Sequence, residues 1–160
     1  MKVFVTVGTH PQQFDRLLKA MDEIAKQAKK TQIFGQTGNS TYKPKFFPYI
    51  EFIKEPEYSG KFRESDVIVS HGGAGAIIHA MEFRKKLVIV PRLKKFSEHT
   101  NDHQQELAEL LEKHGKAIAV NNAEDIRSAL EKIRKFSPDF DSTKKQLIQG
   151  LEKWFAEIKG

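Results

Sequence analysis

Short apolar runs and helical segments alternate along the whole chain, and this alternation restricts the possible fold more than any other feature. The runs are rich in β-branched residues, as in KVFVTV at 2–7 and DVIVS at 66–70. The other candidate strands cover residues 31–37, 49–54, 86–91 and 116–120. Strands that alternate with helices favour an α/β domain, and continuous apolar runs indicate parallel strands buried on both faces.

Apolar residues at helical spacing lie between these runs. In the segment 12–30, Phe14, Leu17, Leu18 and Met21 fall on one side of a helix. Further helices are predicted over residues 59–64, 74–84, 101–114, 121–136 and 142–158. With right-handed crossovers, the commonest topology for about six such strands is a Rossmann-like doubly wound sheet of order 3-2-1-4-5-6. Its ligand crevice opens at the carboxyl ends of strands 1 and 4, which are neighbours.

Composition excludes several classes of protein. The chain has 160 residues, which suits a single domain, and no cysteine, which excludes disulfides, thiolate metal sites and a cysteine nucleophile. No apolar stretch approaches the roughly 20 residues that span a bilayer, so we expect a cytoplasmic protein. The net charge is +6, with lysines in scattered pairs. Two readings stay open: a solvated surface, or a face that attracts phosphates, nucleic acid or anionic lipid.

Residues 70–75 read SHGGAG and join the fourth predicted strand to a helix. Glycine permits positive φ and close approach of a ligand to the backbone, while a helix N-terminus presents free N–H groups and the positive end of its dipole. Together they predict a cradle for a diphosphate. The alternative is a tight turn without a ligand. If the cradle is correct, a valine at Gly73 is expected to block binding and leave the fold intact.

Other nucleotide and metal motifs do not fit. The dinucleotide fingerprint belongs after the first strand, where GTHPQQF has one glycine, and GAGAII places Ile78 where a third small residue is needed. The chain has no Gly-Lys-Ser/Thr run of a P-loop. His99 and His103 could share a helical face, but no third metal ligand stands at a recognisable spacing. We therefore predict no metal site.

Four motifs in sequence order resemble the C-terminal, nucleotide-sugar-binding half of glycosyltransferase family 28. The motifs are VTVGTH with FDRLLKAMDEI, QTGNSTYKPK, DVIVSHGGAGAIIHAMEFRKKLVIVPR, and EHTNDHQQELAELL, and the likeness covers roughly residues 2–135. The chain looks most like the small, separate donor-binding subunits. These include the cytosolic subunit of the two-chain UDP-GlcNAc transferase of N-glycan assembly and the PssE-type subunits of exopolysaccharide synthesis. The larger single-chain relative is MurG.

The resemblance implies one half of a GT-B fold that binds a UDP-sugar as donor substrate, with no tightly bound cofactor. It implies inverting transfer of a hexose-type sugar, such as GlcNAc or glucuronic acid, to a lipid-linked acceptor. A membrane-associated partner subunit would handle that acceptor in a heterodimer at the cytoplasmic face of the membrane, and a terminal helix over 142–158 would pack either in the core or on this partner. We expect no nucleic acid. The alternatives are a non-catalytic nucleotide- or nucleic-acid-binding module and a self-associating stand-alone enzyme.

The resemblance also assigns site residues. To the donor diphosphate it assigns Gly8, Thr9, Ser70, His71, Gly72, Gly73, Ala74 and Gly75. To the sugar, ribose and base it assigns His79, Glu82, Arg92, Asn101, His103, Gln104 and Gln105. The chain departs from the family at His79, which stands where many relatives carry a ribose-binding glutamate, and Glu82 is the nearest carboxylate on that helix. His10 is the candidate general base, and a loop histidine without a catalytic role is the alternative.

Overall fold

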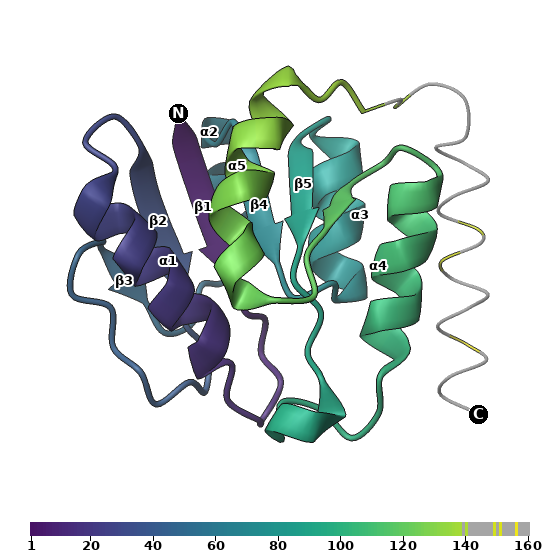
Figure 1. Cartoon of the computed structure of the whole chain (residues 1–160), viewed down its shortest axis with the longest axis horizontal. Coiled ribbons are helices and arrows are strands. Elements are labelled where there is room, and N and C mark those ends of the chain that lie inside the picture. Colours follow the sequence, from purple (N-terminus) through teal and green to yellow (C-terminus); the bar gives the residue numbers. More distant parts are fainter. Residues whose placement is uncertain (139, 141–148, 150, 152–155, 157–160) are drawn as a thin grey trace.

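The computed structural model describes residues 1–138, 140, 149, 151 and 156, and its centre is a six-stranded parallel sheet (Figure 1). The strands are β1 (Lys2–Thr6), β2 (Gln32–Gln36), β3 (Tyr49–Ile50), β4 (Val67–Ser70), β5 (Lys86–Ile89) and β6 (Ile118–Ala119). Their order is β3-β2-β1-β4-β5-β6, and every adjacent pair is parallel. This confirms the doubly wound sheet that the sequence predicts, with β1 and β4 side by side.

Alternate strand residues divide the core into two layers, one on each face of the sheet. The helices are α1 (Asp15–Gln27), α2 (Glu57–Glu64), α3 (Ala74–Glu82), α4 (His103–Lys113) and α5 (Ile126–Lys135). Val67 and Val69 pack with α1 and α5, whereas Ile68 between them packs with α2, α3 and α4. Figure 1 shows α1 and α5 in front of the sheet and α2 and α3 behind it. Burial on both faces explains why the central strands read as continuous apolar runs.

The two edge strands are shorter than the sequence predicts. The apolar runs at 49–54 and 116–120 contribute only Tyr49–Ile50 and Ile118–Ala119, because each edge strand pairs with one neighbour alone. Beyond β3 the chain leaves the sheet, and the side chain of Phe52 is exposed. The helix predicted over 142–158, with the partner contact proposed for it, lies outside the described residues apart from 149, 151 and 156.

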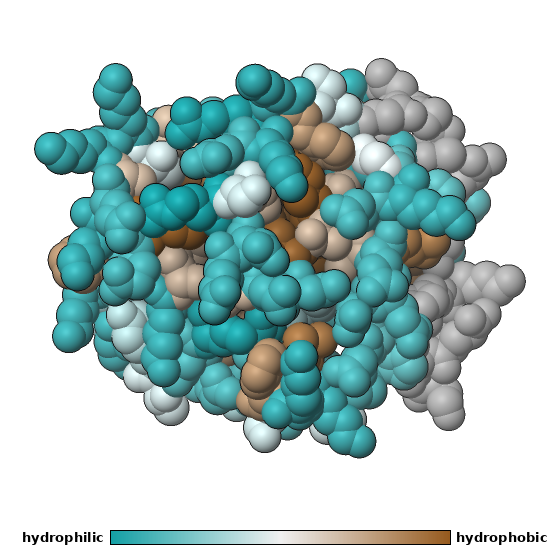
Figure 2. Space-filling view, in the orientation of Figure 1, coloured by the Kyte–Doolittle hydropathy of each residue, from teal (hydrophilic) through white to brown (hydrophobic). Residues whose placement is uncertain are grey.

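The surface is mostly polar. Figure 2 shows that teal, hydrophilic residues cover most of the face formed by α1 and α5. Apolar residues are visible in small patches among these hydrophilic side chains. No helix in the part of the chain that the structure describes has the length and apolarity required to cross a bilayer.

Candidate functional site

The loops after β1 and β4 meet at the carboxyl edge of the sheet. Thr6 and Ser70 are register partners, so the two loops leave the sheet side by side. The ring of His71 fills the space between them. A Cβ added to Gly8 would lie 2.6 Å from the ring of His71, and one added to Gly73 would lie 2.2 Å from its Nε2. The two loops predicted to hold the diphosphate are therefore packed together through one histidine.

Two of the three loop glycines are required by the fold itself. Gly72 has a φ of +84°, and a Cβ there would lie 2.9 Å from Ile89. A side chain on Gly73 would collide with His71, which is buried. Our expectation that a valine at Gly73 spares the fold is therefore wrong. Gly75 differs, because no described atom lies within 4 Å of the position that a Cβ would take, apart from its chain neighbours and the backbone of its own helix.

The N-terminus of α3 offers unused backbone donors beside Gly75. The first helical hydrogen bond at this end runs from the Ile77 N–H to the Gly73 carbonyl, and no side chain caps the helix. Among the described residues, none accepts a hydrogen bond from the N–H groups of Ala74, Gly75 or Ala76. Three adjacent free N–H groups at the positive end of a helix dipole suit an anion such as phosphate.

The remaining diphosphate candidates are placed less directly. The hydroxyl of Ser70 is buried and accepts a hydrogen bond of 3.3 Å from the Gly72 N–H, so it holds the loop in shape. Thr9 is exposed, and its carbonyl accepts a hydrogen bond from Asn39. Of these two residues, Thr9 alone presents its side chain to solvent beside the loop.

His71 is a neutral, buried imidazole. Burial, with a smaller contribution from the charge of Arg92, lowers the pKa of His71 from 6.5 to about 3. Its Nδ1 lies 3.4 Å from the carbonyl oxygen of Thr6, which only accepts hydrogen bonds, so Nδ1 carries the proton and Nε2 does not. His71 therefore donates to the β1 backbone and fixes the spacing of the two loops.

The buried position of His71 predicts acid sensitivity of the fold. Below pH 6.5 the His71 imidazole is protonated in the unfolded state, but in the folded state it stays neutral down to about pH 3. Unfolding therefore takes up a proton in this range, and the free energy of unfolding falls as pH falls. We expect the free energy of unfolding to drop by about 2 kcal/mol between pH 6.5 and about pH 5 on account of this residue. Urea titrations of the wild type and His71→Asn measure it. The variant should show a flatter pH dependence, and equal slopes would contradict the prediction.

His10 carries its proton on the atom that a general base needs free. Its Nδ1 accepts a hydrogen bond of 3.3 Å from the Gln12 N–H, so the proton of the neutral ring lies on Nε2. Burial is the largest cause that lowers the pKa of His10, followed by the charges of His99 and Arg92. This arrangement makes His10 a hydrogen-bond donor at Nε2. It argues against the general-base role that the sequence suggested.

Arg92 lies in the interior and not in a base pocket. Its side chain is fully buried, and the guanidinium donates hydrogen bonds to the backbone carbonyls of Val7, Gln12, Gln13 and Glu98. Burial lowers the pKa of Arg92 to about 10, so the group stays charged at neutral pH. This corrects the prediction that Arg92 contacts the nucleotide base, uracil. Arg92 instead ties the loop after β1 to the loop after β5.

Gln104 is the residue of the NDHQQ motif that reaches the glycine loop. Its Cβ lies 3.9 Å from the position that a Cβ on Gly72 would take, so the first turn of α4 borders the loop. Its Oε1 accepts a hydrogen bond of 3.1 Å from the Arg92 N–H. Among the described residues, none is a hydrogen-bond partner of the side-chain amide nitrogen.

The other residues of that motif are engaged locally. Asn101 Oδ1 accepts a hydrogen bond of 3.2 Å from the His103 N–H at the start of α4. Gln105 Nε2 donates to Glu109 one turn along the helix, at 3.1 Å. His103 Nδ1 lies 3.6 Å from Glu106 Oε2. The structure therefore brings Gln104 to the loop but does not bring Gln105 there.

His79 is paired with a carboxylate that the sequence analysis did not identify. Its Nδ1 lies 2.8 Å from the Gly75 carbonyl and its Nε2 lies 2.9 Å from Glu55 Oε1. Glu55 precedes α2, and its other oxygen accepts hydrogen bonds from Ser59, which lower the pKa of Glu55 more than the bond from His79 does. Glu82, by contrast, ends α3, about 12 Å along the axis from its first residue. Glu55 is thus the carboxylate beside the loop.

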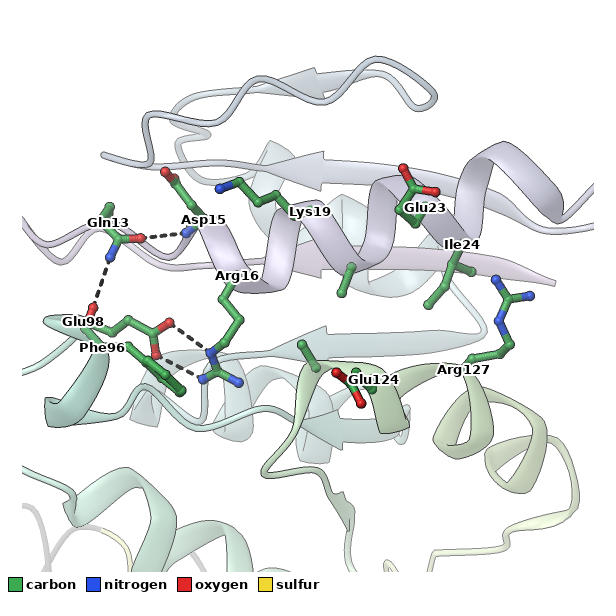
Figure 3. Close-up of a pocket in the computed structure, with 12 residues that line it drawn as sticks. Gln13, Asp15, Arg16, Lys19, Glu23, Ile24, Phe96, Glu98, Glu124 and Arg127 are labelled. Carbon is green, nitrogen blue, oxygen red and sulfur yellow. Dashed lines mark hydrogen bonds and ion pairs between the residues drawn. The ribbon is translucent and has the colours of Figure 1, made fainter.

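A separate hollow lies between α1 and the segments 96–98 and 123–127 (Figure 3). Its volume is about 850 Å³, and both signs of charge line it. Arg16 reaches from α1 to the carboxylate of Glu98, with two N–O distances of 2.9 Å. We do not assign the ligand site to this hollow, because the glycine loop and the N-terminus of α3 do not line it. Among the described residues, no group of three or more His, Asp or Glu side chains could hold a metal ion.

Comparison with known proteins agrees with this geometry. The model of the glycosyltransferase family 28 C-terminal domain matches residues 2–157. The UDP-N-acetylglucosamine transferase subunit ALG13 of Mus musculus is 34% identical over 124 residues, which cover 71% of this chain and 10% of that protein. The chain therefore spans about a tenth of that relative's length.

Two solved structures share the fold. The glycosyltransferase of kitacinnamycin superposes with a TM-score of 0.67 at 18% identity, over 95% of this chain and 39% of that one. MurG of Acinetobacter baumannii superposes with a TM-score of 0.61 at 14% identity, over 96% of this chain and 50% of that one. The fold is thus that of one half of a GT-B glycosyltransferase. With a family match over nearly its whole length, the chain belongs to the family of glycosyltransferase family 28 C-terminal domains.

Proposed function

We propose that this chain is the UDP-sugar-binding subunit of an inverting GT-B glycosyltransferase. The donor sugar is a hexose, for which GlcNAc is favoured by the name of the mouse relative. The acceptor is lipid-linked and is bound by a membrane-associated partner subunit, which recruits this chain to the cytoplasmic face of the membrane. The word subunit in that relative's name supports the partner.

One observation carries the proposal: α3 begins with three free N–H groups at the switch point between β1 and β4. An open approach at Gly75 lets a diphosphate reach these donors. As the bond between the sugar and the diphosphate breaks, negative charge grows on the leaving UDP. Preorganised donors that meet this charge lower the barrier, at roughly 3 kcal/mol for a well-placed group. The base that activates the acceptor hydroxyl is assigned to the partner.

Calorimetric titration with UDP, UDP-GlcNAc and UDP-glucuronic acid tests the proposal. We expect UDP to bind, and the sugar nucleotide with the right hexose to bind in competition with it. If UDP fails to bind the chain both alone and with its partner, the proposal is wrong. Salt-dependent binding of RNA or DNA without UDP binding would favour the nucleic-acid-binding alternative instead.

Glu55 is expected to hold the ribose hydroxyls. His79 and Ser59 fix both of its oxygens one helical turn from the start of α3, and each oxygen retains capacity to accept another hydrogen bond. Glu55→Gln should weaken UDP binding by about tenfold and reduce the preference for UDP over 2′-deoxy-UDP, since a hydrogen bond to a charged group contributes about 1.5–3 kcal/mol. Competition titrations with the two nucleotides measure this.

The matched control for Glu55→Gln is Glu82→Gln, at the far end of α3. It should leave both affinities unchanged. If Glu82→Gln and not Glu55→Gln reduces the preference for UDP, the ribose contact belongs to the helix after all.

A further inference from the structure

Two histidines from distant loops stack at the cleft. His10 follows β1, and His99 precedes α4. Their ring centroids are 4.7 Å apart and their planes meet at 29°. Both rings are partly exposed. Each contributes to lowering the pKa of His71, so both lie within electrostatic reach of the histidine that joins the two loops.

The two rings have the same tautomer. In each, the backbone N–H two residues later donates to Nδ1 at 3.3 Å: Gln12 to His10, and Asn101 to His99. The proton of each neutral ring therefore lies on Nε2. No described residue is a hydrogen-bond partner of either Nε2 atom. The stack thus presents two N–H groups to which no hydrogen bond is made within the part of the chain that the structure describes.

The charged groups that act on the pKa of His10 and His99 are arginine and histidine side chains. Burial is the first cause that lowers the pKa of each ring. The charge of His99 and then that of Arg92 also lower the pKa of His10, and the charges of Arg92 and His103 lower that of His99, which hydrogen bonds with Asn101 raise in part. The loop after β4 contributes His71, which is neutral.

The nearby carboxylates are already engaged. Glu98 accepts hydrogen bonds from Arg16 and from the Leu93 N–H. Asp102 accepts one from the Lys94 N–H. The loop after β2 contributes an uncharged amide, Asn39, which donates to the His10 carbonyl. Surroundings that keep two imidazoles uncharged and leave their Nε2–H groups without a described partner suit an anion, which would restore their affinity for protons.

We propose that His10 and His99 form a histidine clamp that donates Nε2–H hydrogen bonds to the phosphate oxygens of the sugar nucleotide and takes up a proton when that anion binds. This inference rests on the proposed function and adds His99 to the site. In the free protein the clamp is neutral near pH 7. Two phosphate charges beside it raise the proton affinity of Nδ1, the one nitrogen of each ring that can still take a proton. The new Nδ1–H displaces the 3.3 Å hydrogen bond that this nitrogen accepts from the backbone N–H of Gln12 or Asn101. Binding therefore strengthens as pH falls, by at most about tenfold per pH unit for each proton taken up.

UDP-GlcNAc is the probe, because its diphosphate is esterified on both sides and has no group that titrates between about pH 5 and pH 8. Calorimetry of the full chain near pH 7, in buffers with different ionisation enthalpies, counts the protons taken up. We expect up to about one proton in the wild type. If the affinity is independent of pH and the observed enthalpy is independent of buffer, the clamp does not exist. If UDP-GlcNAc does not bind at any pH, the proposed function fails instead.

Gln and Asn substitutions of His10 and His99 distinguish the loss of the hydrogen-bond donor from the loss of the titratable group. Gln keeps an amide donor near the place of Nε2 but cannot titrate, so the double variant His10→Gln/His99→Gln should keep most of the affinity and lose proton uptake. Asn keeps an acceptor for the backbone N–H, but its shorter side chain does not reach the place of Nε2, so His10→Asn/His99→Asn should lose both. His114→Gln, at the exposed end of α4, is the control and should change neither.

A direct measurement covers the case in which a variant does not fold. Long-range ¹H–¹⁵N correlation spectra of the wild-type imidazoles distinguish the two neutral tautomers. We expect both rings to carry the proton on Nε2 in the free protein, and one of them to become doubly protonated with UDP-GlcNAc. Rings that carry the proton on Nδ1, or that stay unchanged on binding, would overturn the inference.

Discussion

Gly75→Val is expected to weaken the binding of UDP at least 100-fold while the fold remains stable. The Cβ of a helical residue tilts toward the helix N-terminus, so a valine here projects over the free N–H groups at the start of α3. Loss of contact with such preorganised donors costs roughly 3 kcal/mol, which corresponds to a factor of about 100. Because no described residue other than its chain neighbours and the backbone of its own helix lies within 4 Å of the new Cβ, the fold has room for the side chain.

Gly60→Val is the matched control for this change. Gly60 also lies in a helix, α2, and a Cβ there also meets no described atom within 4 Å beyond its chain neighbours and the backbone of that helix. Both variants should unfold within about 1 kcal/mol of the wild type in urea, since glycine and valine differ little in helix propensity. Calorimetry should then find normal UDP binding in Gly60→Val and none in Gly75→Val. Equal binding by both variants would remove the diphosphate from the N-terminus of α3.

The sheet order could be predicted because it depends on local patterns and on a general rule of handedness. Each central strand is an uninterrupted apolar run, and helical spacing separates the runs. Right-handed crossovers then put β1 beside β4. The edges were less predictable. Residues 49–54 are as apolar as a central strand, but only Tyr49–Ile50 has a neighbour with which to pair.

The site was predicted less well, because loop residues are positioned by contacts from distant segments. The glycines at 72 and 73 suggested an open cradle, but the first is held by its φ and by Ile89, and the second makes room for His71. Nothing local in SHGGAG says that the histidine turns inward. Likewise, Glu55 becomes a candidate only when His79 is seen to bond to it across 24 positions of sequence.

Arg92→Met is expected to destabilise the fold by about 3–5 kcal/mol, as measured by urea unfolding. The substitution leaves four backbone carbonyls without their donor, and the hydrogen bonds to two of them, Val7 on the β1 side and Glu98 on the β5 side, are buried. Arg92→Lys should recover only part of the loss, because one ammonium group cannot reproduce the planar fork that reaches both loops. Arg127→Met is the control. That arginine makes an exposed hydrogen bond to Gln27, and its loss should cost at most about 1 kcal/mol.

The same variants decide between a structural and a ligand-binding role for Arg92. If Arg92 only holds the two loops together, its substitutions should lower the free energy of unfolding. Folded Arg92→Lys should then keep most of its affinity for UDP. A uracil contact predicts the reverse: an unchanged urea midpoint and a large loss of affinity that depends on the base. The four carbonyl bonds and complete burial of the side chain favour the first outcome. Arg92 also supplies a positive charge that lowers the pKa of His10 and His99. Arg92→Lys keeps a positive charge, so it should also keep proton uptake on UDP-GlcNAc binding.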